Sequence, residues 1–210
     1  MPARPRSSDD TSTRRRLAPE ARRAQLLAVA EDVFARLGFQ GTAVDDIAAE
    51  AGVTRTLIYK YFADKDEIYL ECVRVARETL DAAMVSAAGQ HDAPEQQLRA
   101  GFHAYFRFVR DGGSKWDVLF GGGAAATGSV VDAAAAFRYQ TVEVITALLL
   151  AAAPKLAQDA AMTYAHAISG AAEQAAKWWR RNPDTSVDTL VERLMDVLWA
   201  GLERIATLNA

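Results

Sequence analysis

The side chains best suited to chemistry in this chain lie close together, between positions 54 and 65. They are hydroxyl, cationic and phenolic groups: Thr54, Arg55, Thr56, Tyr59, Lys60, Tyr61 and Lys65. Arg and Lys can read the edges of guanine, whereas hydroxyl and phenol groups bond phosphate oxygens. A Thr at a helix start can also offer its hydroxyl to a phosphate together with free backbone N–H groups. The combination favours contact with nucleic acid over catalysis, since no Ser-His-Asp or paired-carboxylate spacing accompanies it.

Two short helices around a tight turn would hold these side chains in place. The stretch reads TAVDDIAAEAGVTRTLIYKYFADKDE over residues 42–67. Thr42-x-x-Asp45 predicts a capping box at the start of one helix, and Gly52 is expected to end it. Thr54 is expected to cap a second helix, nine residues long, which carries the polar group. Two helices at this spacing are the helix-turn-helix design, whose second helix enters the major groove.

The rest of the chain shows apolar residues at helical spacing, and no segment shows the alternation of a strand. One apolar stripe covers residues 26–37, and another covers residues 98–109. Asp64 is expected to cap a long helix between them. Two further long helices frame Pro154, and the last helix is expected to begin near Val187. The predicted fold class is therefore all-α.

Composition and charge describe a globular chain with a basic beginning. Half of the 210 residues are hydrophobic and 24% are charged. No run reaches the roughly 18 apolar residues of a membrane span. The single cysteine, Cys72, fits a reducing cytoplasm, so a cytoplasmic protein without a membrane partner is expected. The net charge is −3, yet residues 1–65 carry 11 Lys and Arg against 9 Asp and Glu, whereas residues 66–210 carry 13 against 18. A small basic face can thus precede an acidic body.

The helix-turn-helix stretch resembles the tetracycline-repressor (TetR) family of bacterial one-component transcriptional regulators. The matching pieces are FARLGFQGT, VDDIAAEAGV, LIYKYF and DKDEIY, within about residues 18–70. The resemblance implies phosphate contacts from Tyr59 and Lys65. It implies base and backbone contacts from other members of the group, and the full predicted DNA-contact set is Thr42, Thr54, Arg55, Thr56, Tyr59, Lys60, Tyr61 and Lys65. The chain departs from the family at Leu57, where many members carry Thr.

The resemblance also implies a domain organisation: an all-α chain whose three-helix DNA-binding head is joined by a long fourth helix to a C-terminal helical domain. Residues 1–17 are expected to be a disordered arm, residues 18–64 the DNA-binding domain, and residues 65–210 the effector-binding and dimerisation domain. The run Arg14 to Arg16 is either a solvated tail or an arm for the minor groove.

The expected function is that of a repressor released from near-palindromic, double-stranded operator DNA by a small hydrophobic effector. No cofactor is expected. A homodimer follows because one short reading helix contacts too few bases for specific binding.

Aromatic residues in the second half of the chain suggest where an effector would bind. Helix bundles place ligands between helices, among aromatic side chains and a few polar groups. The candidate lining is Phe102, Phe106, Trp116, Phe120, Tyr139 and Tyr164, with His103 or His166 as a polar anchor. An elongated apolar pocket bounded by the later helices and abutting the fourth is expected. The Gly-rich and Ala-rich segment 121–129 is expected to be a mobile entrance.

The two C-terminal helices carry the residues expected at a dimer interface. One helix holds small residues that permit close approach, and the other holds an aliphatic stripe. The expected interface positions are Ser169, Gly170, Leu194, Leu198 and Gly201. Both sets could instead be internal core.

Other readings of the sequence remain open. A helical enzyme or ligand carrier without sequence-specific DNA binding is the main alternative to a regulator. An activator, or a regulator without a ligand, would share the same first 65 residues. No metal site is expected, because His91, His103 and His166 lack ligand spacing with one another and with Cys72. A nucleotide site is not supported either, because the glycines at 121–123 lack the Lys-Ser/Thr of a phosphate loop.

Overall fold

The computed structural model describes residues 18–121 and 129–208. The N-terminal arm, its three arginines and most of the segment expected to be an entrance lie outside the described residues. Within the described ranges the chain is all helical, as predicted. The elements are α1 (Pro19–Gly41), α2 (Val44–Glu50), α3 (Arg55–Tyr59), α4 (Lys65–Ala88), α5 (Pro94–Asp111), α6 (Gly113–Trp116), the π-helix η1 (Asp117–Gly121), α7 (Ser129–Ala152), α8 (Gln158–Trp179) and α9 (Val187–Leu208).

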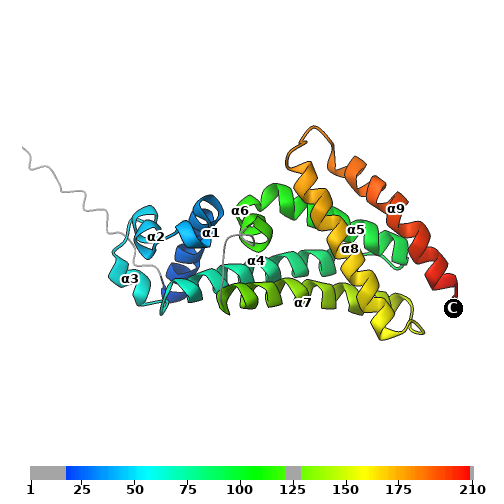
Figure 1. The fold of residues 1–210 in the computed structure, drawn as a ribbon, viewed down its shortest axis with the longest axis horizontal. Helices are drawn as coiled ribbons and strands as arrows, with labels where there is room; N and C mark the ends of the chain where they lie inside the picture. Colours follow the sequence, from blue (N-terminus) through cyan, green and yellow to red (C-terminus); the bar gives the residue numbers. More distant parts are fainter. Residues whose placement is uncertain (1–17, 122–128, 209–210) are drawn as a thin grey trace, which may run out of the picture.

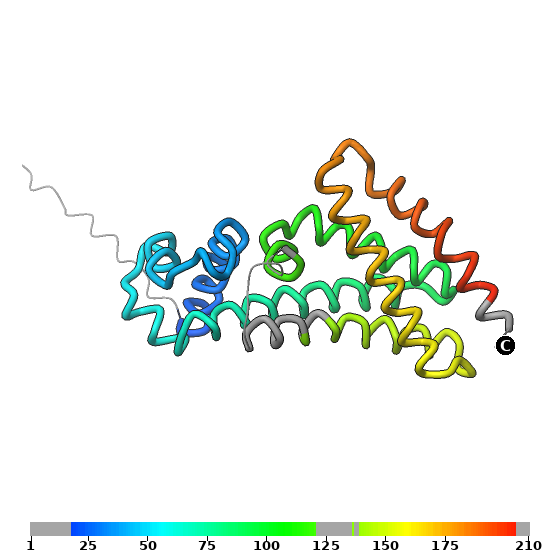
Figure 2. Tube along the Cα trace, viewed as in Figure 1, coloured from blue at the N-terminus to red at the C-terminus, as the bar shows by residue number. Residues whose placement is uncertain are grey.

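The molecule is elongated, with a small helical cluster at one end (Figure 1). Helices α1 to α3 form this cluster, which we call the head, and α4 to α9 form the body. Helix α4 leaves the head and runs through the body beside α7, while α8 crosses both (Figures 1 and 2). Helices α5 and α9 pack together at the other side of α4, and the C-terminus lies at the end remote from the head.

The core of the head comes from the apolar stripe of α1. Leu26, Ala30, Val33 and Phe34 are buried, as the spacing predicts. Leu37 belongs to the same stripe but is 43% exposed. The reason lies one residue further, because Gly38 has φ +71° and breaks the helical path before α1 ends. A left-handed backbone of this kind is easily adopted only by glycine.

The turn between α2 and α3 is a Schellman motif. Gly52 has φ +63°, its N–H donates to the carbonyl of Ala49, and the N–H of Val53 donates to the carbonyl of Ala48. These bonds satisfy carbonyls that the end of α2 would otherwise leave unpaired. Thr54 then caps α3, its hydroxyl accepting from the N–H of Leu57. The predicted stop and the predicted cap are both confirmed.

The start of α2 differs from the prediction. Its N-cap is Ala43, and the carboxylate of Asp46 accepts from the N–H of Ala43 at 2.8 Å. Thr42 is not the cap, because its hydroxyl donates to the carbonyl of Gly38 at 2.7 Å. Helix α3 is also shorter than the nine residues expected, ending at Tyr59 with Lys60 in a turn.

Helix α4 joins the two parts of the molecule. Asp64 caps it, as predicted, by accepting from the N–H of Glu67 at 2.8 Å. Its buried side includes Tyr69 near the head and Met84 near the far end, and it packs against α1, α5 and α7. One continuous helix therefore contributes to the cores of both head and body.

A candidate DNA interface and an internal cavity

The surface of α3 presents the polar group singled out by the sequence. Thr54, Arg55, Thr56, Tyr59 and Lys60 are exposed, and Tyr59 is 41% exposed despite its aromatic ring. Ile58 is fully buried beneath them and anchors the short helix to the head. An exposed row of hydroxyl, cationic and phenolic groups on a helix held from below is suited to lie in a groove of DNA.

Arg55 is held in place by two neighbours in the head. It pairs with Asp45 of α2 at 2.8 Å and donates to the hydroxyl of Tyr59 at 3.0 Å. Hydrogen bonding to Tyr59 and the charge of Asp45 raise the pKa of Arg55. Both members of the Arg55–Asp45 pair are more than half exposed, so solvent screens the pair and it adds little to stability. The ion pair therefore orients the guanidinium but is weak enough that a base or a phosphate can replace the carboxylate as its partner.

Lys65 has a role inside the protein that its sequence position did not reveal. Its ammonium donates to the carbonyls of Phe39 and Thr42 at 2.9 and 3.0 Å, and it lies 4.3 Å from the centre of the Phe39 ring. Lys65 thus ties the end of α1 to the start of α4. An ammonium has three N–H donors, so one remains for an outside acceptor such as a phosphate.

Two other members of the predicted DNA-contact set are less accessible than the α3 row. Thr42 is only 3% exposed, and its hydroxyl is occupied by Gly38. The Thr42 side chain is therefore poorly placed for a direct contact with DNA. Tyr61 is half-buried and packs against the core.

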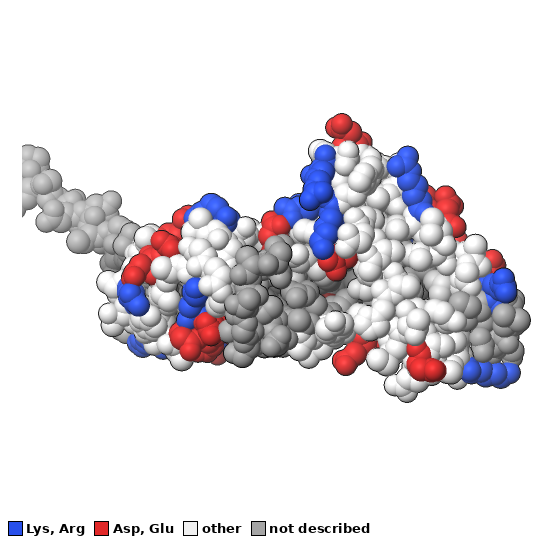
Figure 3. Space-filling view, viewed as in Figure 1, with Lys and Arg blue, Asp and Glu red and all other residues white. Residues whose placement is uncertain are grey.

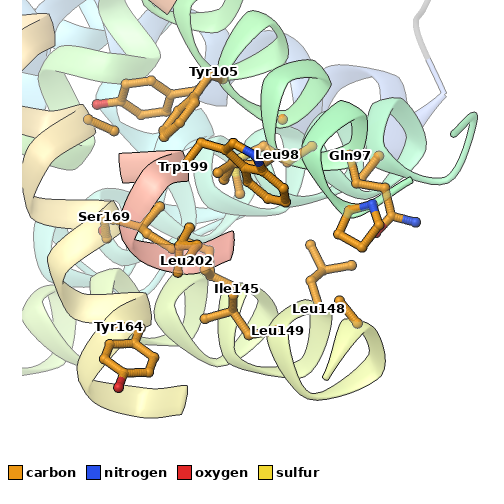
Figure 4. A pocket seen from close by; sticks show the side chains of 18 of the residues that line it. Gln97, Leu98, Tyr105, Ile145, Leu148, Leu149, Tyr164, Ser169, Trp199 and Leu202 are labelled. Carbon is orange, nitrogen blue, oxygen red and sulfur yellow. The ribbon is translucent and has the colours of Figure 1, made fainter. Parts of the chain in front are cut away.

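The body contains a partly open cavity of about 470 Å³ between its helices. Its walls come from α4, α5, η1, α7, α8 and α9. Side chains from α5, α7, α8 and α9 surround a common space in Figure 4, which labels Leu98, Ile145, Tyr164 and Trp199 among others. The lining is mainly aliphatic and aromatic. A volume of this size is within the ~300–1,000 Å³ range of small-molecule sites.

Three of the six aromatic residues predicted to line a pocket do so. Phe102, Phe120 and Tyr164 are in the cavity wall. The other three have different surroundings, and so do both predicted histidine anchors.

Phe106 is fully buried against Trp179, with ring centres 5.9 Å apart, and lies outside the cavity wall. Trp116 packs on Phe120 behind the wall. Tyr139 is 62% exposed and contacts His166 edge to face. His103 is half-buried outside the cavity wall, with Nδ1 3.7 Å from a carboxylate oxygen of Asp188. Aromatic type alone did not distinguish wall residues from core residues.

Much of the wall is aliphatic and was missed by the sequence analysis. Ile145, Leu148 and Leu149 come from α7, and Trp199 and Leu202 come from α9. The sequence of α7 does carry a sign of this wall, because its apolar residues occupy more than one side of the helix. A helix that is apolar on several sides needs partners on each, and a cavity is one of the surroundings that can meet this need.

The cavity touches the helix that carries the head. Leu80 and Met84 of α4 are in its wall, together with Thr141 of α7. Thr141 donates its hydroxyl proton to Asp81 at 3.0 Å, and Arg77 pairs with the same carboxylate. Burial raises the pKa of Asp81, against the opposing effect of Thr141 and Arg77. This small polar cluster joins α4 to α7 beside an otherwise apolar space.

One face of α8 and α9 is poor in charge. Residues 160–172 of α8 include no charged residue, and Figure 3 shows a broad uncharged surface over these two helices with charges along its edges. Met162 and Trp178 are 47% and 46% exposed on α8, and Val197 is 76% exposed on α9. A charge-poor surface that also exposes large apolar side chains is typical of a contact surface.

The residues predicted for the dimer interface divide between this face and the interior. Gly170 and Gly201 are exposed, with no atom within 4 Å of the position a Cβ would take. Ser169 lies in the cavity wall, and Leu194 and Leu198 pack against the core.

Neither a metal site nor a membrane helix emerges from the part of the chain that the structure describes. No group of three or more His, Cys, Asp or Glu side chains there could hold a metal ion. Among the same residues, no helix is long and apolar enough to cross a membrane.

A helix-turn-helix head on a helical body with an internal cavity defines the class of DNA-binding regulators with a ligand-binding domain. The family description "Bacterial regulatory proteins, tetR family" matches residues 26–72, and "Tetracyclin repressor-like, C-terminal domain" matches residues 94–201. The chain belongs to the TetR family of transcriptional regulators. Its family and its relatives are regulators rather than enzymes, which sets aside the alternative of a helical enzyme.

Individual relatives are similar along most of their length. The HTH-type transcriptional activator FasR of Mycolicibacterium smegmatis is 24% identical over 190 residues, which are 90% of this chain and 87% of that protein. A crystal structure of a TetR-like transcriptional regulator from Rhodococcus sp. RHA1 is 29% identical with a TM-score of 0.73, covering 90% of this chain and 99% of that chain. FadR from Bacillus subtilis, solved with stearoyl-CoA, has a TM-score of 0.73 at 16% identity, covering 83% and 96%, and shares the fold.

Proposed function

We propose that this chain is a ligand-responsive repressor that binds a near-palindromic operator as a homodimer and leaves it when a hydrophobic effector occupies the body. The observation that carries the proposal is the apolar cavity of about 470 Å³ with Leu80 and Met84 of α4 in its wall. Because α4 also contributes to the core of the head, a ligand in the cavity contacts the element that positions the reading helix. The ligand must bind the DNA-incompetent state more tightly than the competent one.

The DNA side of the proposal rests on the α3 row. Arg55 and Lys60 are assigned to base edges, and Thr54, Thr56 and Tyr59 to phosphates or bases near the start of the helix. Tyr61 and Lys65 are assigned to the backbone on the strength of the family resemblance. Lys65 would contribute its third N–H while keeping its two bonds inside the head.

The lining supports an amphiphile with an apolar chain as the effector. The polar side chains of the wall, which include Gln97, Tyr164 and the carboxylate of Glu203, are spread among aliphatic ones. An apolar wall cannot compensate the desolvation of several charges, so a charged head group would have to remain in water at the mouth of the cavity. FadR of Bacillus subtilis, which shares the fold, was solved with stearoyl-CoA. We therefore propose an acyl thioester or a similar long-chain amphiphile, its chain in the cavity.

The charge-poor face of α8 and α9 is the proposed dimer interface. Val197, Met162 and Gly170 are its central positions, replacing the inward-facing Leu194, Leu198 and Ser169 of the sequence prediction. Val197→Glu should yield folded monomers that bind the operator poorly, because a charge would be buried at the contact. Val85→Glu is a matched control, since Val85 is 48% exposed on α4. Sedimentation of both variants decides, and a dimeric Val197→Glu protein would contradict the assignment.

The experiment that tests the function is operator selection followed by a ligand titration. The protein should enrich a two-fold symmetric sequence from random double-stranded DNA. Stearoyl-CoA should then raise the Kd for the selected operator, whereas free coenzyme A should not. Failure to enrich any sequence would overturn the DNA assignment. Release by coenzyme A alone would overturn the role of the apolar cavity.

A second mode of regulation is favoured by one relative. FasR, which is similar along 90% of this chain, is named an activator. A reporter gene placed behind the selected operator separates the two modes, because deletion of a repressor raises expression and deletion of an activator lowers it.

A further inference from the structure

The wall of the cavity is buried at one end and exposed at the other. Helix α5 runs toward the head and α7 runs away from it, so Tyr105 and Thr141 mark the end nearer the head (Figures 1 and 2). Both residues are buried. At the remote end, Pro94 of α5 and Ala152 of α7 are exposed. The cavity therefore has a closed end near the head and a mouth at the end remote from it.

The polar groups of the wall differ between these two ends. At the closed end, the Thr141 hydroxyl donates to Asp81, and the Tyr105 hydroxyl accepts from the indole N–H of Trp116 at 3.2 Å. At the mouth, Glu203 of α9 is exposed to water. A charged head group keeps its hydration only at the mouth, because an apolar wall cannot compensate its desolvation. An amphiphile therefore enters the cavity with its apolar end first.

Two helices along the cavity give the same value for its length. Wall residues extend from Pro94 to Tyr105 on α5 and from Thr141 to Ala152 on α7, which is eleven residue steps on each helix. At about 1.5 Å per residue, both walls are roughly 17 Å long. An extended alkyl chain advances about 1.3 Å per carbon, because each C–C bond of about 1.5 Å is inclined to the chain axis. A chain of about 13 carbons therefore spans the cavity.

The volume of the cavity leads to a similar chain length. The space measures about 470 Å³. A methylene group is close in size to a water molecule, which occupies about 30 Å³ of liquid. The cavity thus has room for about 16 such groups, which is one chain of this length and not two side by side.

Two wall residues limit how deep a chain can reach. Ala172 is the wall residue of α8 nearest the head and is 6% exposed. Phe120 belongs to η1, which packs against α1 and α4, and its ring centre lies 6.5 Å from that of Tyr105. Ala152 is the last residue of α7 and lies at the mouth. The same substitution at Ala172 and at Ala152 therefore compares the two ends of the cavity.

We propose that the cavity selects its ligand by chain length and takes one acyl chain of about 12–16 carbons. The terminal methyl group lies against Phe120 and Ala172, and the head group stays at the mouth. The inference rests on the proposed function and specifies the ligand class of its site. Stearoyl-CoA exceeds this length, so the carbons next to its thioester remain outside.

The test is a titration of saturated acyl-CoAs into the protein without DNA. Calorimetry below the concentrations at which they form micelles gives the Kd for chains of about 8 to about 20 carbons. Each methylene that enters the cavity should lower the Kd about fourfold. The gain should end at about 12–16 carbons, where the cavity is full. A Kd that falls at the same rate up to the longest chain, or stops falling at about 10 carbons or fewer, would overturn the proposal.

Matched variants test which end of the cavity sets the limit. Ala172→Leu should move the limit to chains about two carbons shorter, because the larger side chain fills the closed end. Ala152→Leu makes the same change at the mouth and should leave the limit in place. Phe120→Ala should move it about two carbons or more in the other direction, and it keeps the test decisive if Ala172→Leu does not fold. Equal shifts in the two Leu variants, or an unchanged limit in Phe120→Ala, would overturn the assignment of the closed end.

Free fatty acids titrated in parallel distinguish the two sources of such a chain. Both series should reach the same limit, because only the chain enters the cavity, and the series with the lower Kd identifies the head group. Different limits would overturn the proposal. A chain-length limit without any effect on operator binding would contradict the proposed function and leave the inference intact. Operator release by stearoyl-CoA without a limit would do the reverse, and absence of binding by both series would overturn both.

Discussion

The head and the body are built from the same kind of helix but differ in what their interiors contain. In the head, Ile58 and Val33 are fully buried and the apolar residues pack against one another. In the body, a space of about 470 Å³ separates residues that would otherwise form a core. The two proposed sites differ in the same way. In the head the proposed DNA contacts are polar side chains on the outside of a packed unit, whereas in the body the proposed ligand site is the space that is not filled.

The difference agrees with the two proposed roles. A reading helix has to keep its geometry when DNA binds, and a solid core beneath a short helix provides this. A ligand domain has to change on binding, and unfilled volume leaves room for the walls to rearrange. Atoms that line a cavity lack packing partners on one side. Packing therefore stabilises the body less than it stabilises the head.

The largest expected effect tests this contrast directly. Ile58→Ala should lower the free energy of unfolding by about 2–5 kcal/mol, as truncations in packed cores do. Ile145→Ala, in the cavity wall, should cost clearly less, because its side chain already lacks neighbours on one side. Denaturant titrations of both variants measure the two values. Equal losses would mean that the body is as tightly packed as the head.

Base reading should depend on the head alone. Arg55→Ala should relax the preference at one or two operator positions by roughly 1–3 kcal/mol each. The response to stearoyl-CoA should be unchanged, because Arg55 is remote from the cavity wall. Selection of binding sites from random DNA reveals the preference of the variant. An unaltered consensus would transfer the reading role to Lys60 or Thr56.

Filling the cavity should affect the body alone. Ile145→Trp replaces an aliphatic side chain of the wall by a bulky indole. It should raise the Kd for stearoyl-CoA at least tenfold, which corresponds to about 1.4 kcal/mol of binding free energy. Operator binding without ligand should remain near that of wild type. A fluorescence or calorimetric titration with stearoyl-CoA measures the affinity of Ile145→Trp, and Phe106→Trp is the comparison variant. Phe106 is buried outside the wall, so its enlargement should overpack the core and destabilise by about 1–3 kcal/mol instead.

Lys65 is expected to contribute both to the stability of the head and to DNA binding. Removal of its two bonds to the α1–α2 connection should lower stability by about 1 kcal/mol per bond or less. Lys65→Ala should also reduce the slope of operator affinity against salt by about one. Lys60→Ala serves as the stability control, because the Lys60 side chain makes no such bonds within the described part of the chain. A variant with full stability and an unchanged salt slope would contradict both roles.

The smallest expected effect is a dependence on pH. Burial raises the pKa of Asp81 from its ordinary value of 3.8, so the folded state binds this proton more readily than the unfolded state does. The stability of wild type relative to Asp81→Asn should therefore fall as the pH rises above about 4.

Glu71 provides the opposite sign. Hydrogen bonds from Arg74 lower its pKa, so wild type should lose stability relative to Glu71→Gln as the pH falls below about 4. The two changes of stability with pH are therefore expected to have opposite signs. Thermal melts of wild type and of both variants between pH 3 and neutral pH measure them, and equal signs would contradict one of the two assignments.

The sequence predicted the head in more detail than the body. The stop at Gly52 and the caps at Thr54 and Asp64 are confirmed because these signals act within a few residues. The cap predicted at Thr42 was wrong because Gly38, four residues earlier, supplies a competing carbonyl. The second role of Lys65 depends on a connection 23 to 26 residues away, which no local pattern encodes.

In the body the helices were predictable but the cavity wall was not. The onset of α9 at Val187 is confirmed, since it follows from apolar spacing. Phe102 lines the cavity whereas Phe106, one turn later on the same helix, does not. Which of two neighbouring rings meets empty space depends on the angle at which other helices cross, and that angle is set by contacts far apart in the chain.

The length of α4 has a mechanical consequence. Its 24 residues, at about 1.5 Å each, make a rod of roughly 36 Å. A rotation of about 5° around the end near the cavity carries the other end through about 3 Å, close to the ~3.4 Å between successive bases of a DNA strand. A tilt of that size thus shifts the head by nearly one base step. In the proposed dimer, with one such arm in each protomer, the angular stiffness of α4 would therefore limit how accurately the distance between the two heads is maintained.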